Sequence, residues 1–369
     1  MTLVNQRVAA SAVLAAQFDL DVVAMRFAPT IDDLGRISAG KLARAAATGV
    51  ALAARLIARR PDAVYVTLSP HGGALYRDCA YAALARLAGV PRIFHMHARG
   101  VSDELAAGWR RRLGAWVFDR AWVIHLGPQL VDDTAGLADP ARVVIVENGV
   151  PDHNPSGALA SSGGAVPRVL FLSNMIADKG PLVLVEAIAA LHRRGLAIEA
   201  TFAGAAGDAR TVEDFHAAVA RHGLADRVRY VGPVFDAAKH ALFASHDAFA
   251  LPSARDAFAL VLLEAMQHGL PTVTTTVGAL PQIVVDGETG FLVPPGDVAA
   301  LADRLEQLAT RPELRRRLGT AARQRYRERF TLEAFEQRLA AALLGVVRPG
   351  GDLGVRQPVL ARDQAPREA

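Results

Sequence analysis

Short apolar runs alternate along the chain with longer segments in which apolar residues recur every three or four positions. The short runs predict buried strands, and the longer segments predict helices that pack against them. In the first half of the chain, the predicted strands lie at residues 21–27, 63–68, 92–96, 121–125 and 142–146. In the second half, they lie at residues 168–173, 198–203, 228–231, 248–251 and 271–275. This alternation favours an α/β protein with doubly wound parallel sheets.

The chain opens on a helical pattern and not on a strand. Residues 2–16 predict a helix, whereas an α/β domain normally opens with a strand and a glycine-rich turn. A sheet without its first strand would have a gap near its middle. Two interpretations stay open: the true start lies upstream, or the fold is incomplete.

A segment rich in proline, glycine, serine and alanine separates the two halves. Residues 151–167 lack periodicity and predict an interdomain linker. We therefore expect one domain over residues 1–150 and another over residues 168–330, in keeping with a length of 369 residues. Residues 331–346 predict an amphipathic helix, and residues 347–369 predict a disordered tail.

The composition is that of a globular protein with a mild positive charge. Apolar residues make up 51% of the chain, charged residues 21%, and the net charge is +4. Lysine occurs only at Lys41, Lys179 and Lys239, and we interpret the excess of arginine as a genome preference and not as a nucleic-acid surface. The single cysteine, Cys79, excludes an intramolecular disulfide and a cysteine metal cluster. Without a signal peptide or an apolar run of about 18 residues, a cytoplasmic protein is expected, with peripheral attachment to the inner face of a membrane left open.

The stretch 252–271 combines an apolar run with two carboxylates. Asp256 precedes the run, and Glu264 lies inside it. If a helix begins near Ala257, its free N–H groups and positive dipole end point where Asp256 points. This layout fits a polyol phosphate, with the helix N-terminus for the anion and the carboxylates for hydroxyls. A capping Asp256 and a Glu264 that reaches solvent would explain the same pattern.

Further polar residues stand at predicted strand ends. His95 and His97 alternate out of an apolar strand and would share one face, but no third ligand at matching spacing supports a metal site. Lys179 precedes a predicted helix, where an ammonium can pair with a phosphate. The dinucleotide and P-loop fingerprints are absent.

A basic triplet lies between two tryptophans in the first half. Residues 110–112 are arginines, flanked by Trp109 and Trp116. Such a helix could rest on an anionic membrane surface. A solvated arginine face with inward-packed tryptophans would give the same pattern.

Residues 148–330 resemble the retaining glycosyltransferases of family 4. The matching pieces occur in family order: Asn148-Gly-Val150, Leu170-Phe-Leu-Ser-Asn174, Lys179-Gly180, Phe202-Ala-Gly204, Val231-Gly232, Leu251-Pro-Ser253, Asp256 to Glu264 with the following Ala-Met-Gln-His-Gly-Leu-Pro271, and Gly287-Glu-Thr-Gly-Phe-Leu-Val-Pro294. The N-terminal half resembles the family more loosely, chiefly at residues 91–97. The resemblance implies a GT-B fold of two Rossmann-like domains that face a cleft, with residues 331–346 crossing back toward the first domain.

The resemblance also implies a function and a site. A sugar would pass with retention from an NDP-sugar, UDP- or GDP-linked, to a hydroxyl of a glycan or lipid-linked acceptor, in cell-surface polysaccharide or glycolipid synthesis, with no required metal or cofactor. Glu264 would bind the ribose, and Lys179 would contact the diphosphate, with Asn174 at the place of a second family cation. The donor sugar would meet Asp256 and His97. The backbone of Phe258, Ala259 and Leu260 would approach the sugar and phosphates.

Three residues depart from the family pattern. Asp256 is one methylene shorter than the usual glutamate, Ala259 replaces a glycine, and Asn174 replaces an arginine. These departures keep two alternatives in view. The chain could be a catalytically weakened relative that acts as a binding or scaffold protein, or a sugar-nucleotide epimerase on the same GT-B scaffold.

Overall fold

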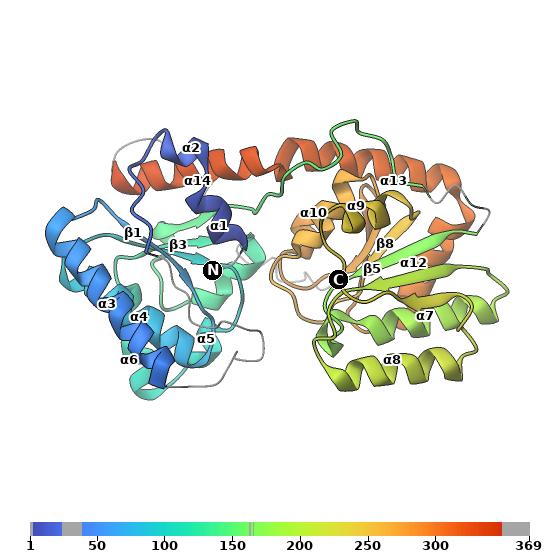
Figure 1. The fold of residues 1–369 in the computed structure, drawn as a ribbon, viewed down its shortest axis with the longest axis horizontal. Coiled ribbons are helices and arrows are strands. Elements are labelled where there is room, and N and C mark those ends of the chain that lie inside the picture. Colours follow the sequence, from blue (N-terminus) through green and yellow to red (C-terminus); the bar gives the residue numbers. More distant parts are fainter. Residues whose placement is uncertain (1–2, 24–38, 162–163, 165, 349–369) are drawn as a thin grey trace, which may run out of the picture. The chain divides into compact units, whose positions relative to one another are not determined.

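The computed structural model describes residues 3–23, 39–161, 164 and 166–348. The chain divides into two compact units, which are treated separately below (Figure 1). Unit one consists of residues 1–147 and 336–369, and unit two of residues 148–335. None of the described helices combines the length and the apolar character needed to cross a bilayer.

Unit one contains a parallel sheet of four described strands in the order β1-β2-β3-β4. The strands are β1 (Val64–Leu68), β2 (Arg92–Met96), β3 (Trp122–His125) and β4 (Val143–Ile145). Four predicted strands are thereby confirmed to within two residues at each end. The strand predicted at 21–27 is wrong for residues 21–23, which form none, and residues 24–27 lie outside the described part. The expected gap is also wrong for the described strands, because each pairs with its sequence neighbour.

Helices α3 (Ala39–Arg59), α4 (Gly72–Leu87) and α6 (Gly108–Phe118) cover one face of this sheet (Figure 1). The shorter helical elements are α1 (Leu3–Ala9), α2 (Ala12–Ala15), α5 (Val101–Glu104), η2 (Pro128–Thr134) and η3 (Pro140–Arg142). The helix predicted at 2–16 is divided at Ser11, because the Ser11 hydroxyl accepts the Leu14 N–H (3.2 Å) and starts a second helix.

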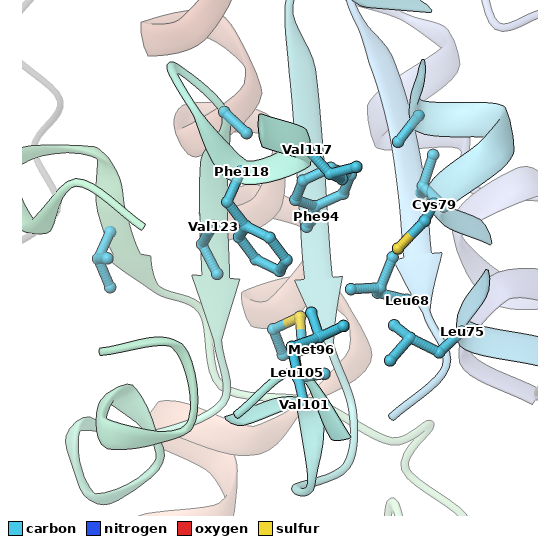
Figure 2. Close-up of a cluster of buried hydrophobic side chains, with 14 residues drawn as sticks. Leu68, Leu75, Cys79, Phe94, Met96, Val101, Leu105, Val117, Phe118 and Val123 are labelled. Carbon is cyan, nitrogen blue, oxygen red and sulfur yellow. The ribbon is translucent and has the colours of Figure 1, made fainter. Parts of the chain in front are cut away.

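A buried apolar cluster joins the sheet to these helices (Figure 2). Phe94 of β2 and Phe118 of α6 lie with their ring centroids 4.9 Å apart, and Leu68 and Leu75 close the cluster toward β1 and α4. All five residues of β2 are buried, as expected for a strand covered on both faces. Burial raises the pKa of the Cys79 thiol to about 12, so this side chain acts as a small apolar group.

Unit two contains a six-stranded parallel sheet in the order β10-β9-β8-β5-β6-β7. The strands are β5 (Arg168–Leu172), β6 (Glu199–Ala203), β7 (Val228–Tyr230), β8 (Ala248–Leu251), β9 (Thr272–Thr275) and β10 (Gly290–Val293). Five of them are predicted from sequence, whereas β10 is not. It is a four-residue strand without the long helix that normally precedes a parallel strand, and a Cβ at Gly290 would lie 2.2 Å from the Thr272 carbonyl oxygen.

Helices cover both faces of the second sheet (Figure 1). On one face lie α7 (Pro181–Arg193), α8 (Ala209–Arg221) and α12 (Val298–Thr310). On the other lie α9 (Asp236–Ala244), α10 (Leu260–Gln267) and α13 (Pro312–Arg325). The remaining helical elements are η4 (Ala177–Lys179), α11 (Leu280–Ile283), η5 (Tyr326–Phe330) and α14 (Leu332–Val347), most of which, from residue 336 on, belongs to unit one.

The segment predicted as a linker is held against unit two over much of its length. Arg323 donates to both carboxylate oxygens of Asp152 (3.0 and 2.8 Å), and the Asn154 amide donates to the Gln267 carbonyl (3.0 Å). The Ala160 N–H donates to the His268 carbonyl (2.8 Å). Composition alone did not indicate these contacts, and the role of the segment between two domains stays a prediction. The predicted tail lies outside the described residues, apart from residues 347 and 348.

Candidate functional site

The order of strands in unit two places a site at the carboxyl ends of β5 and β8. From β5 the chain builds outward to β6 and β7 on one side, and it later returns to add β8 on the other side. Ligands of open α/β sheets bind beyond the strand ends at such a reversal of strand order. The two segments that follow these strands are residues 173–180 and 252–259, which include most of the predicted site residues.

Lys179 and Asp256 meet at this point although they are 77 positions apart in sequence. The Lys179 ammonium lies 2.5 Å from Asp256 Oδ2. Both side chains are largely covered, with exposed fractions of 23% for Lys179 and 11% for Asp256. Asp256 Oδ1 receives no hydrogen bond from the described residues. The pair therefore offers a cation and an open carboxylate oxygen to a ligand.

The two segments are held together by hydrogen bonds. The Ser253 hydroxyl donates to the Asp178 carbonyl (2.9 Å), and the Ala254 N–H donates to the same oxygen (2.8 Å). Gly180 follows Lys179 with a φ of +76°, and a Cβ there would lie 2.1 Å from the Pro252 carbonyl oxygen. Only glycine allows this approach, so the position of Lys179 depends on a glycine at residue 180.

Asn174 is exposed at the end of β5, beside the turn that follows β6. Gly204 of that turn has a φ of +143°, and a Cβ there would lie 1.9 Å from the Ser173 carbonyl oxygen and 3.2 Å from the Asn174 nitrogen. The backbone after β6 therefore lies close to the backbone after β5. The Asn174 side chain remains available to a ligand.

Helix α10 begins at Leu260, with Ala259 at its N-cap position and no side chain capping it. The expected start near Ala257 is wrong by three residues. The alternative in which Asp256 is a capping residue is also wrong, because its carboxylate pairs with Lys179. Phe258 and Ala259 are each 7% exposed, so it is mainly the backbone of this turn that can face a ligand.

Glu264 lies within α10 and is paired with Lys239 of α9. The Lys239 ammonium is 2.7 Å from Glu264 Oε1, and the side chains are 23% and 13% exposed. The alternative in which Glu264 reaches freely into solvent is wrong. Lys239 was not predicted as a site residue, although lysine is so rare in this chain that each copy was a usable signal.

His97 follows β2 and belongs to unit one. Its ring lies against that of His95, with centroids 4.0 Å apart and the planes tilted by 36°, which confirms that these two side chains share a face. Burial lowers the pKa of His97 to about 4, so the imidazole is neutral near pH 7. His97 therefore does not supply a positive charge, and its Nε2 is buried without a partner among the described residues.

Two other buried histidines make stability depend on pH. His125 is 1% exposed and His268 is 5% exposed, and burial lowers the pKa of each from 6.5 to about 4. As pH falls below 6.5, the unfolded chain binds protons that the folded chain does not. We expect the free energy of unfolding to fall by about 1.5 kcal/mol per histidine between pH 6.5 and pH 5.

Urea unfolding at pH 7.5, 6.5 and 5.0 measures this loss. His268→Asn should remove one histidine's share of the slope, whereas His192→Gln, at an exposed position of α7, should leave the slope unchanged. A free energy of unfolding that stays constant over this range would contradict the prediction.

The tryptophans beside the arginine triplet do not both pack inward. Trp109 is 63% exposed and Trp116 is 38% exposed, both on α6. Arg110, Arg111 and Arg112 are exposed as well. The interpretation with inward-packed tryptophans is therefore wrong, and α6 presents aromatic and basic groups together.

No group of three or more histidine, cysteine, aspartate or glutamate side chains suited to a metal occurs among the described residues. The arrangement in unit two instead supplies two lysines, two carboxylates and a helix N-terminus.

Residues 163–325 match the family of glycosyl transferases group 1, so a glycosyl transferase group 1 domain makes up most of unit two. The chain is 35% identical over 186 residues to a D-inositol 3-phosphate glycosyltransferase of Corynebacterium diphtheriae, a match that covers 48% of this chain and 43% of that protein. It is 31% identical over 272 residues to a D-inositol 3-phosphate glycosyltransferase of Streptomyces griseus, covering 63% of this chain and 58% of that protein. The chain thus matches about half the length of these curated relatives.

Solved structures support the fold. Anabaena HepE in complex with UDP and glucose superposes with a TM-score of 0.66 over 83% of this chain and 82% of that chain, at 22% identity. At this sequence identity, the similarity shows that the two proteins share a fold and nothing more. The fold is α/β with two parallel sheets, and its structural neighbours are GT-B proteins.

Proposed function

We propose that this protein is a glycosyltransferase of family 4 that moves a sugar, with retention, from a nucleoside diphosphate sugar to an acceptor hydroxyl. The observation that carries the proposal is the Lys179–Asp256 pair at the strand-order reversal of the glycosyl transferase group 1 domain. Residues 168–330 would bind the donor, and residues 1–150 would bind a glycan or lipid-linked acceptor. Cell-surface polysaccharide or glycolipid synthesis is the proposed setting.

Each part of the donor has a proposed contact. When the sugar leaves, negative charge develops on the diphosphate, and Lys179 with the N-terminus of α10 would stabilise that charge without a metal. Asn174 would contribute a neutral hydrogen bond to the diphosphate, where an arginine would contribute a charge. The backbone of Phe258, Ala259 and Leu260 would face the sugar and phosphates, and Glu264 would accept hydrogen bonds from the ribose.

Asp256 and His97 are the proposed contacts of the donor sugar. Asp256 keeps one oxygen open beside Lys179, and His97 is a neutral hydrogen-bonding group. A UDP- or GDP-sugar is the proposed donor, and UDP is favoured because HepE was solved with UDP and glucose.

A panel of UDP-, GDP-, ADP- and dTDP-sugars tests the proposal. We expect one nucleotide to raise the melting temperature and the matching donor to be consumed when an acceptor hydroxyl is supplied. Binding without turnover would favour the weakened relative. An epimerised sugar and free nucleotide, formed without acceptor, would favour the epimerase, and failure to bind any donor would overturn both the transferase and the epimerase.

We also propose that the protein works in the cytoplasm with α6 in contact with the inner face of a membrane. The exposed Trp109 and the three exposed arginines are the supporting observation. Aromatic rings occupy the headgroup level, and arginines favour anionic lipid.

Cosedimentation with vesicles that contain about one-third anionic lipid tests this contact. Trp109→Ala should weaken binding about tenfold, since the ring loses its apolar burial. Arg210→Gln, at a position of α8 that is 88% exposed, is the matched control and should have little effect. Equal binding to neutral vesicles, or no binding at all, would contradict the proposal.

A further inference from the structure

Lysine is rare in this chain, and two of its three copies contact the two carboxylates of the site. The sequence has 41 lysine and arginine residues in total, and only Lys41, Lys179 and Lys239 are lysines. Lys179 contacts Asp256, and Lys239 contacts Glu264. Both pairs therefore place a lysine ammonium against a carboxylate of the candidate site.

Each lysine contacts one carboxylate oxygen and leaves the other open. The Lys239 ammonium is 2.7 Å from Glu264 Oε1, while Oε2 receives no hydrogen bond from the described residues. An ammonium is a point charge, whereas a guanidinium is a planar fork that binds both oxygens of a carboxylate. Arg323 binds a carboxylate in this two-pronged way, because its guanidinium donates to both oxygens of Asp152 (3.0 and 2.8 Å).

A second contact next to the first holds Lys239 in place. His240, the following residue of α9, lies with Nδ1 3.2 Å from His268 Nε2. His268 stands four residues after Glu264, so the two contacts are one turn apart along α10. The Lys239 backbone N–H also donates to the Phe235 carbonyl (3.2 Å), as the first turn of α9 forms. Helix α9 therefore presents its ammonium to Glu264 from a fixed position.

We propose that Lys239 is a positioning residue for nucleotide binding. It holds Glu264 through Oε1 so that Oε2 accepts a hydrogen bond from a ribose hydroxyl. A lysine is required here because an arginine would occupy both oxygens. This inference rests on the proposed function, in which Glu264 binds the ribose of the donor.

Calorimetric titration of Lys239→Met and Lys239→Arg tests the inference, with UDP and 2′,3′-dideoxy-UDP as probes, or the GDP pair if GDP is the nucleotide bound. The wild type should bind the ribonucleotide about tenfold more tightly than the dideoxy form, as expected for a hydrogen bond to a charged group. In both variants, affinity for the ribonucleotide should fall about tenfold, and affinity for the dideoxy form should change less than about twofold. A residue that merely supports the fold would weaken both ligands equally.

The outcomes separate this inference from the proposed function. If the wild type binds none of the nucleotides in the donor panel, the proposed function fails. If the wild type prefers the ribonucleotide and both variants keep that preference, the role of Lys239 is overturned. If Lys239→Met does not fold, Lys239→Arg keeps the charge, and full preference in that variant overturns the requirement for lysine. Lys41→Met, which removes the lysine of α3, is the control and should bind like the wild type.

Discussion

Asp256→Ala is expected to lower kcat by about 10²- to 10³-fold while nucleoside diphosphate binds at least as tightly as before. The loss of turnover follows from the proposed role of Asp256, because a polar group that contacts the reacting sugar acts mainly in the transition state. Binding is kept because the Lys179 ammonium, 2.5 Å from the carboxylate, loses its partner and becomes fully available to the diphosphate. Steady-state transfer and titration with the nucleoside diphosphate measure the two quantities separately.

Asp178→Ala is the matched control for this change. Asp178 lies in the same pair of segments, but its side chain is 53% exposed and its contact with Arg255 is long, at 3.9 Å, so both kcat and nucleotide affinity should stay close to those of the wild type. Equal losses of kcat and of affinity in Asp256→Ala would show that Asp256 serves nucleotide binding, against its proposed role at the donor sugar.

Glu264→Gln is expected to weaken nucleoside diphosphate binding by about tenfold. The amide has nearly the shape of the carboxylate, but it removes the charge that strengthens hydrogen bonds to ribose hydroxyls, and it leaves the Lys239 ammonium without its ion pair. About 1.4 kcal/mol is lost when the hydrogen bond from the ribose to Oε2 weakens, which corresponds to this factor in Kd. Calorimetry with the nucleotide that stabilises the wild type provides the measurement.

Glu213→Gln, at an exposed position of α8, controls for the loss of a surface carboxylate. Its Kd should match that of the wild type. An unchanged Kd in Glu264→Gln would show that Glu264 does not bind the ribose. The melting temperatures of both variants without nucleotide show whether any loss of binding reflects unfolding.

The periodic pattern of the sequence predicted most strands, because a buried strand is a local property of consecutive residues. The nine strands β1 to β9 lie where apolar runs predicted them, and their alternation with helices was enough to indicate parallel sheets. The errors occur where local signals are weak. The four residues of β10 form a strand because Gly290 lets two backbones approach, and α10 starts three residues later than expected.

The pairing of charges depended on contacts that no local pattern contains. By itself, the sequence determined that Asp256 and Glu264 stand out within an apolar segment and that Lys179 precedes a helix. Only the tertiary structure decided their partners, since Lys179 meets Asp256 across 77 positions and Lys239 meets Glu264 across 25. The physical reason is the order of strands. Because β8 is added beside β5 and not beside β7, the segments after these two strands share one edge of the sheet, and that edge carries the site.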